Sequence, residues 1–264
     1  MVDLSEINNV AASFVFQDLL DTEYFKTYKQ AYVNTFATQY FRQYRNYSNL
    51  IKYLNEIYGY NVEHAKGYAK RLRAESNEWR NCEAIFTEII VYRSYIRLIY
   101  QGIIKSIKLE NSECDLILEL SDGTLSYYEV FCVMPPLKIS KSIEELEVHD
   151  IKTHTQDALS SIRQKVLNKI DKQKQLSKKR NNFLVIEINE SLVANDFVVL
   201  SSLSSGYKIT YDKNTLNVIG EGFDWSGSIF NDERLNFLKG IIYFFLGDFE
   251  SHKILTNPNF NSTT

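Results

Sequence analysis

Two carboxylates, Asp115 and Glu129, lie within a stretch that is typical of a β-hairpin, ECDLILELSDGTLSYYEVFCV over residues 113–133. Both have apolar and aromatic neighbours, where an uncompensated charge is costly. Two carboxylates about 5 Å apart repel each other unless a cation lies between them or one keeps its proton. Hard divalent ions such as Mg²⁺ prefer oxygen ligands of this kind. The pair is therefore either a metal site or two unrelated acids on a solvated sheet face.

The turn between the two strands decides whether the carboxylates meet. A two-residue turn at Asp122-Gly123 points them to opposite faces of the hairpin, because side chains alternate along a strand. A three-residue loop that also includes Ser121 places Asp115 directly across from Glu129. The sequence permits both registers, and Gly123 at the third loop position favours the second.

A third carboxylate, Glu88, lies in a predicted helix over residues 77–100. Its neighbours one helical turn away include Ile85 and Val91, so Glu88 lies on or beside the apolar stripe that faces the sheet. A carboxylate in that position needs a partner. One interpretation is a salt bridge to a basic residue of another element. The alternative is that Glu88 points over the hairpin, as a third metal ligand or as a base that acts through water.

A basic helix is predicted over residues 152–179, and Lys165, Lys169 and Lys172 flank its apolar stripe at spacings of four and three. A charge run on a helix is most often a solvated face. Here the run borders the seam where the helix meets the sheet, so a lysine in it is placed to reach a phosphate near the carboxylates. The basic residues further along suit the backbone of a nucleic acid.

The hydrophobic periodicity predicts elements that can hold these residues in place. Residues 1–76 read as a helical region, and residues 77–264 as an α/β domain with helices on a central mixed sheet. Basic residues and tyrosines in the helical region form either a solvated face or a surface for DNA contact or dimerisation. The predicted elements of the second part are a helix at 77–100, strands at 102–110 and on both arms of the hairpin, a helix at 152–179, a strand at 181–189, a short helix near 201–206, and strands at 207–212, 214–221 and 238–246.

Composition narrows the classes of function. The net charge of −3 does not suit a protein that coats nucleic acid by bulk attraction, so such binding needs a local basic patch. The 34 tyrosines and phenylalanines (18 and 16) form an aromatic core or, in part, a surface that stacks on bases. Three cysteines without a CxxC pair, and no signal peptide or membrane-spanning run, predict a soluble, reduced, cytoplasmic chain. No sequence signal for a small-molecule cofactor is present.

The three acids and the basic helix, in the order helix, three strands, helix, strand, resemble the PD-(D/E)XK nuclease superfamily. That family carries an acid on a helix, then an aspartate on one strand, then (E/Q)xK on the next. Those positions match Glu88, Asp115 and Glu129-Val130-Phe131, and the likeness covers roughly residues 77 to 190. The resemblance implies a restriction-endonuclease-like core.

The chain departs from the family pattern at Phe131, which stands where the motif has its lysine. Some members supply this lysine from the following helix, in a pattern similar to K..QL. The run from Lys172 to Leu176 fits that variant, so the resemblance makes Lys172 the first candidate, Lys169 the second, and Gln175 a companion in the site.

The resemblance implies metal-dependent hydrolysis of DNA. Asp115, Glu129 and the Val130 carbonyl would hold Mg²⁺ or Mn²⁺, with Glu88 as a ligand through water or to a second metal. The lysine would orient water or neutralise developing charge, and a homodimer is left open. One alternative, motivated by Phe131 and the acidic net charge, is a catalytically inactive nuclease-fold protein that binds nucleic acid or protein. Another is a helical interaction protein in which the two hairpin acids point to opposite faces.

Overall fold

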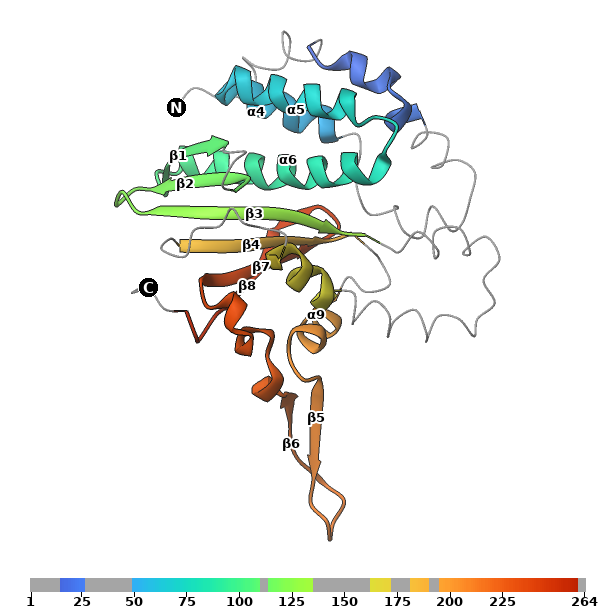
Figure 1. Ribbon diagram of the computed structural model, residues 1–264, viewed down its shortest axis with the longest axis vertical. Helices are drawn as coiled ribbons and strands as arrows, with labels where there is room; N and C mark the ends of the chain where they lie inside the picture. The colour runs from blue at the N-terminus through green and yellow to red at the C-terminus, as the bar shows by residue number, and fades with distance from the viewer. Residues whose placement is uncertain are drawn as a thin grey trace.

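The computed structural model describes residues 15–26, 49–109, 114–134, 162–171, 181–189 and 195–260. Within these residues, helices cover both faces of a curled, mixed, six-stranded sheet (Figure 1). The chain is therefore an α/β protein with helices ahead of the sheet, as the periodicity predicts.

The described helices begin with one 3₁₀ turn and continue into longer segments. They are η2 (Gln17–Asp21), unlabelled helical stretches over residues 23–26 and 162–171, α4 (Asn49–Tyr60), α5 (Val62–Ala74), α6 (Trp79–Tyr100) and α9 (Asp196–Leu203), together with the short turns η4 (Trp225–Gly227), η5 (Ile229–Asn231) and η6 (Glu233–Leu235). The strands are β1 (Ile104–Leu109), β2 (Leu116–Leu120), β3 (Leu125–Val133), β4 (Asn181–Ile188), β5 (Tyr207–Tyr211), β6 (Val218–Phe223), β7 (Leu238–Phe245) and β8 (Asp248–Thr256).

The large sheet has the strand order β1-β2-β3-β4-β7-β8. The first three strands form an antiparallel meander, β3, β4 and β7 run parallel, and β8 closes the edge antiparallel to β7. The predicted order of helix, three strands, helix and strand is confirmed for the part of the chain that the structure describes. Strand β4 is buried on both faces, as its near-continuous apolar run predicts.

Helix α6 is buried almost all round because it lies between the sheet and the pair α4 and α5 (Figure 1). It has no proline or glycine, and it ends where Gly102 takes a positive φ of 75°. The backbone N–H groups of Gly102 and Ile103 then bond to the carbonyls of Ile99 and Leu98, which satisfies the end of the helix. The predicted boundary at residues 76 and 77 lies in the turn between α5 and α6, and the division into two domains stays a prediction.

Two hydrophobic clusters lie on opposite faces of the sheet. On β3, Tyr128 and Val130 contribute to the cluster beneath α6, whereas Val133 contributes to the cluster beneath α9 and the helical stretch over residues 162–171. Because side chains alternate along a strand, Glu129 projects toward the second cluster. Glu88, on α6, approaches the sheet from the face that carries the first cluster.

No helix within the described ranges is both long enough and apolar enough to span a bilayer. The predicted helix at 152–179 is described only over residues 162–171, which are helical. Strand β8 was not predicted, because most of its side chains are exposed on the sheet edge and its sequence lacks a clear apolar alternation.

Replacing Gly123 by alanine is expected to destabilise the fold by about 1 kcal/mol. Gly123 has a φ of 84°, a conformation that costs a residue with a Cβ about that much, although no atom lies within 4 Å of the added carbon. Urea unfolding measures the change.

Gly67→Ala is the matched control, since Gly67 lies in the interior of α5, also with no atom within 4 Å of a Cβ and without a positive φ. Alanine there should stabilise by about 0.5–1 kcal/mol. Equal effects of the two substitutions would contradict the strained loop.

Candidate active site

The loop of the β2–β3 hairpin has three residues, so the register predicted from Gly123 is confirmed. Leu116 pairs with Tyr128 and Glu119 with Leu125, and the Leu120 N–H bonds to the Thr124 carbonyl. The pairing ends at Leu116 and Tyr128; extended by one residue, this register would set Asp115 across from Glu129, although the Asp115 N–H itself bonds to the Tyr128 carbonyl. The two-residue turn, which would send the two carboxylates to opposite faces, is not adopted.

Asp115 lies in a bend immediately before β2, where the two strands begin to diverge. Its backbone N–H bonds to the Tyr128 carbonyl at 3.0 Å, and its Oδ2 accepts the Val130 N–H at 2.7 Å. The Asp115 side chain thus accepts the Val130 N–H, which would otherwise donate to the backbone carbonyl of a further residue of β2. Since the N–H and C=O of one strand residue point to the same edge, the Val130 carbonyl also faces Asp115.

Burial, with the negative charges of Glu88 and Glu129, raises the pKa of Asp115 to about 8. The Val130 N–H and the Lys169 ammonium oppose this rise without cancelling it. The charges of both other acids therefore act on Asp115. An excess of negative charge at a buried carboxyl is the electrostatic state that a bound cation relieves.

Glu129 is buried, and Lys169 of the helical stretch over residues 162–171 contacts it, with the ammonium 2.6 Å from its carboxylate. The same ammonium lies 5.9 Å from the centre of the Phe131 ring. The Lys169 ammonium therefore lies beside both Glu129 and Phe131. One turn earlier, Lys165 donates to the Met134 carbonyl at 2.8 Å.

Of the two predicted lysines, the structure brings Lys169 to the carboxylates. Lys172, the first candidate, and Gln175 lie outside the described residues, so their roles stay predictions.

Glu88 pairs with Arg71 of α5 through two contacts of 2.5 and 2.8 Å. This is the first of the two alternatives that the sequence left open for Glu88, a salt bridge to a basic residue of another element. Burial raises the pKa of the Glu88 carboxyl, and the Arg71 guanidinium opposes that rise. The structure thus supports Glu88 as a charge beside Asp115, held by its own arginine.

Two residues of α5, Arg71 and Tyr68, were not predicted as part of the site. Tyr68 is buried one turn before Arg71, whose guanidinium lies 5.8 Å from its ring centre. Burial, then the Glu88 charge, raises the pKa of Tyr68. Its hydroxyl has no hydrogen-bond partner among the residues that the structure describes. The sequence signal that could have identified them is their spacing of three residues beside the apolar stripe of α5, which puts both on one side of the helix.

A divalent cation fits the kind of donors present, because Asp115, Glu129 and the Val130 carbonyl offer hard oxygen ligands. Within the described ranges, no group of three or more acid, histidine or cysteine side chains is arranged to hold a metal. Mg²⁺ is commonly held by one or two protein carboxylates, with water and substrate phosphate completing its shell. The residues therefore fit a cation on the hairpin pair, and Glu88 does not complete a ligand set in this arrangement.

A second group of buried polar side chains links α6 to β4. Glu83 accepts hydrogen bonds from the Tyr24 hydroxyl at 2.9 Å and the Asn189 amide at 2.6 Å. The Thr87 hydroxyl lies between the Glu83 carbonyl and the Glu187 carboxylate. These contacts join residues 15–26, α6 and the end of β4, and they were not predicted.

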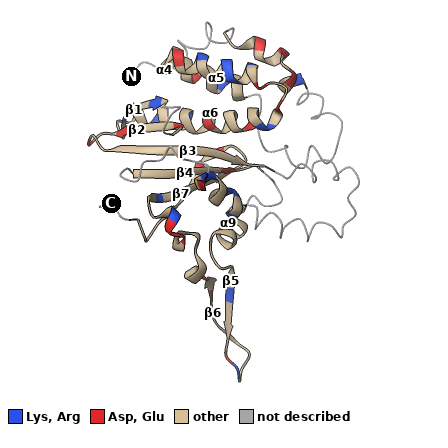
Figure 2. Ribbon diagram, in the orientation of Figure 1, with Lys and Arg blue, Asp and Glu red and all other residues tan. Residues whose placement is uncertain are grey.

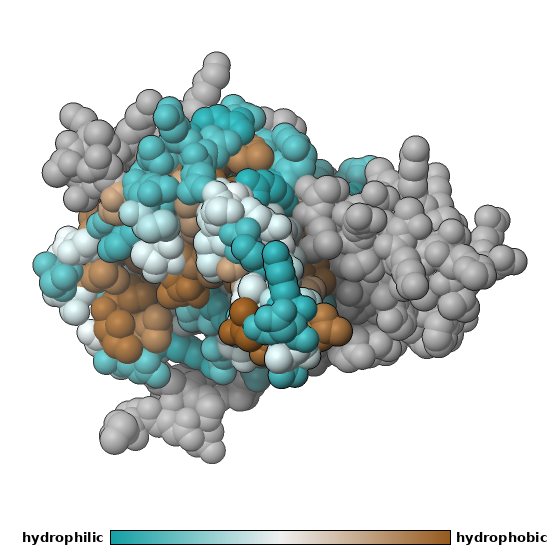
Figure 3. All heavy atoms as spheres, turned by 90° about the horizontal axis from the view of Figure 1, so that it is seen from below, coloured by the Kyte–Doolittle hydropathy of each residue, from teal (hydrophilic) through white to brown (hydrophobic). Residues whose placement is uncertain are grey.

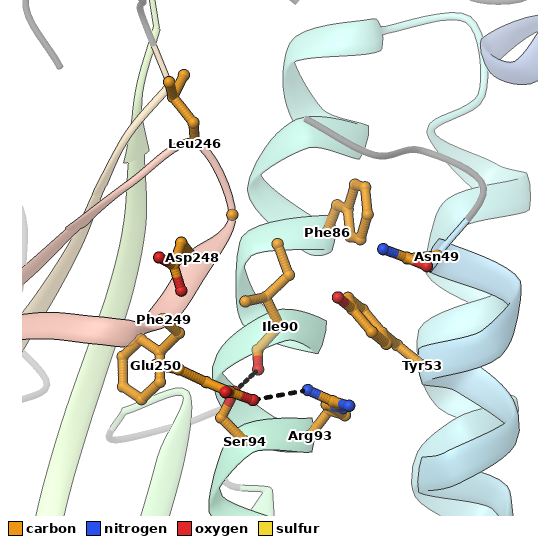
Figure 4. Close-up of a pocket in the computed structure, with 11 residues that line it drawn as sticks. Asn49, Tyr53, Phe86, Ile90, Arg93, Ser94, Leu246, Asp248, Phe249 and Glu250 are labelled. Atoms are coloured by element: carbon orange, nitrogen blue, oxygen red, sulfur yellow. Dashed lines mark hydrogen bonds and ion pairs between the residues drawn. The ribbon is translucent and has the colours of Figure 1, made fainter. Parts of the chain in front are cut away.

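A cavity of about 280 Å³ lies between α4, α6 and the turn from β7 to β8 (Figure 4). Its buried arginine, Arg93, contacts Glu56 at 2.5 Å and Glu250 at 3.5 Å and lies 4.7 Å from the Tyr53 ring centre. None of the predicted site residues lines this cavity. The carboxylates of the hairpin are therefore a separate feature.

The raised pKa of Asp115 predicts that stability falls as pH rises. Below about pH 4 this carboxyl is protonated in both the folded and unfolded chain. Between about pH 4 and 8 the unfolded chain loses the proton and the folded chain keeps it, so the free energy of unfolding decreases by up to about 1.4 kcal/mol per pH unit.

Asp115→Asn should remove this contribution. Urea unfolding of both proteins at pH 5 and pH 8 measures this. The free energy of unfolding of the variant, relative to that of the wild type, is expected to be higher at pH 8 than at pH 5. A difference between the two proteins that is the same at both values would contradict the raised pKa.

Comparison of this chain with known proteins found no matching family model, no matching curated protein and no matching solved structure.

Proposed function

We propose that this chain is a metal-dependent nuclease of the PD-(D/E)XK type, which hydrolyses phosphodiester bonds of DNA. The observation that carries the proposal is the Lys169 ammonium, 2.6 Å from Glu129 and 5.9 Å from the Phe131 ring centre. It provides the motif lysine from another element, beside an aspartate in the register that the motif requires. The helical N-terminal part and the mixed sheet are consistent with a restriction-endonuclease-like core.

In this proposal Asp115, Glu129 and the Val130 carbonyl hold Mg²⁺ or Mn²⁺. The bound cation supplies Lewis acidity toward phosphate and lowers the pKa of water. The Val130 N–H fixes the rotamer of Asp115, so one carboxylate oxygen is already directed before a cation arrives.

Lys169 has a positioning and a charge-neutralising role. Its ammonium carries three donors, and Glu129 is its one salt-bridge partner among the residues that the structure describes, which leaves donors for water or a phosphate oxygen. The apolar Phe131 ring beneath it limits solvation of the charge and strengthens its interactions. Arg71 neutralises Glu88 and thereby limits the repulsion that a phosphate would meet.

A second candidate function is binding without catalysis on the same fold. The contact between Lys169 and Glu129 favours it, because an ammonium so close to the carboxylate can replace a metal ion at that ligand. The two functions differ in a direct way: only the first requires a divalent cation for its activity.

Lys169→Met is expected to lower the rate of DNA cleavage by about 100-fold, the contribution typical of one positioned proton-transfer or charge-stabilising side chain. Cleavage of single- and double-stranded DNA, and of RNA, in Mg²⁺, Mn²⁺ or EDTA measures it. Lys105→Met is the matched control, since Lys105 also contacts a glutamate, Glu119, at 2.6 Å but on the exposed edge of the sheet. Its rate should stay within about twofold of wild type.

Wild-type protein that leaves DNA intact in both metals, or cleaves it equally in EDTA, would overturn the nuclease proposal. If the protein cleaves RNA and not DNA, phosphodiester hydrolysis stands as the proposed reaction and the substrate is RNA. Salt-dependent DNA binding without cleavage or metal uptake would instead establish the binding function.

Mg²⁺ is expected to stabilise the folded protein more at pH 8 than at pH 5. The cation competes with the proton on Asp115, whose pKa is raised to about 8, so less metal binds when this carboxyl is protonated. Thermal unfolding with and without Mg²⁺ measures the shift in Tm. Asp115→Asn should abolish the shift, whereas Asp122→Asn, in the exposed loop, should preserve it. A shift that survives Asp115→Asn would place the metal elsewhere.

A further inference from the structure

The hairpin of β5 and β6 projects from the body of the molecule as an arm (Figure 1), viewed end-on in Figure 3. Every residue of β5 is exposed. A two-stranded hairpin is marginally stable alone in water, and clustered exposed apolar side chains mark an interaction surface. The arm and its base carry eight of the exposed large hydrophobic residues: Phe197, Tyr207, Ile209, Tyr211, Leu216, Val218, Ile219 and Trp225.

Aromatic packing at the base holds the direction of the arm. The rings of Phe197, Tyr207 and Phe223 are in mutual contact, with centroids 5.2 to 5.7 Å apart. The arm is therefore anchored on α9, and its free part begins beyond Tyr207.

The outer edge of β5 presents a row of backbone groups. The Asp224 N–H bonds to the Gly206 carbonyl, so residues 206 and 224 form a hydrogen-bonded pair. The backbone groups of alternate residues then point away from β6, and these residues are Tyr207, Ile209 and Tyr211. No other described strand pairs with this edge, which makes it a template for strand addition.

The charge of the arm decides against a nucleic acid as its occupant. Residues 207–225 contain two lysines and three acids, a net charge of −1 (Figure 2). Phosphate-binding surfaces require an excess of positive charge. The occupant is therefore a protein strand.

We propose that two copies of this chain pair β5 against β5, antiparallel, about a two-fold axis through Ile209. The strand reads Tyr-Lys-Ile-Thr-Tyr, so its pattern of apolar and polar residues is the same in both directions. This pairing sets Tyr207 opposite Tyr211 of the other copy and Ile209 opposite itself. The residues whose backbone groups face outward are then matched with each other, as hydrogen-bonded pairs require.

The charges of the arm are complementary in the same register. Lys208 stands opposite Thr210 of the second copy, and Asp212 of that copy is the next residue on the same face. The two-fold axis makes this contact twice. The exposed apolar area is on the order of several hundred Å² per copy, at the lower end for a specific interface, which predicts a dissociation constant of micromolar order.

Sedimentation velocity of the full chain over a concentration series up to about 100 µM tests the pairing. The wild type should shift from one to two copies as concentration rises. Ile209→Lys places like charges directly opposite each other, so it should raise the dissociation constant at least about tenfold. Ile254→Lys is the control, because Ile254 also lies on an edge strand, β8, and is similarly exposed. The exposed fraction is 54% for Ile254 and 43% for Ile209. It should dimerise as the wild type does.

A cysteine at position 209 gives a second test that does not depend on the affinity. In a hydrogen-bonded pair the two Cα atoms lie about 5.5 Å apart, within reach of a disulfide. Mild oxidation should cross-link Ile209→Cys and leave Glu221→Cys, on β6, largely unlinked. Three results would each overturn the proposal: a wild type that stays a single copy at every concentration, a dimer that Ile209→Lys leaves intact, or equal cross-linking at positions 209 and 221. If the single copy were found with a different protein bound at β5, this edge would belong to that partner.

Discussion

The three-residue loop at the end of the β2–β3 hairpin is the constraint on which the candidate site depends. A shift of one residue in this register would turn every side chain of β2 to the other face of the sheet. Asp115 would then leave Glu129 and lose the Val130 N–H, and its aspartate side chain would enter an apolar layer. Gly123, with a φ of 84°, allows the loop to close without the steric cost of a Cβ.

The site is a balance of charges brought together from α5, α6, β3, the helical stretch over residues 162–171 and the bend before β2. Glu88 on α6 is paired with Arg71 on α5, and Glu129 on β3 is paired with Lys169. Burial, with the charges of Glu88 and Glu129, raises the pKa of Asp115 to about 8, and the Val130 N–H and the Lys169 ammonium only partly oppose this rise. The arrangement therefore has one buried carboxyl that a cation would stabilise, next to a second acid that is already paired with a lysine.

Local rules were sufficient for the part of the site that lies on the hairpin. The turn chemistry of Gly123 predicted the register of β2 against β3, which ends one residue from Asp115, and helical periodicity predicted that Glu88 is buried. The partner of Glu88 could not be predicted, because α5 meets α6 through tertiary packing.

The choice between Lys169 and Lys172 had the same difficulty. The sequence sets both beside the apolar stripe of one predicted helix, and the structure describes only Lys169, which contacts Glu129. The separation of the β5–β6 arm from the main sheet also depends on tertiary structure, although both strands were predicted. Sequence patterns assign a strand; they do not assign the sheet that it joins.

A crystal structure of the protein grown with Mn²⁺ would show, through the anomalous signal of the metal, whether the hairpin carboxylates hold a cation. We expect a peak within about 2.2 Å of one oxygen of Asp115 and one of Glu129, with the Lys169 ammonium still beside the pair. Full density for Lys169 on Glu129, with no anomalous peak at the hairpin at millimolar Mn²⁺, would contradict it.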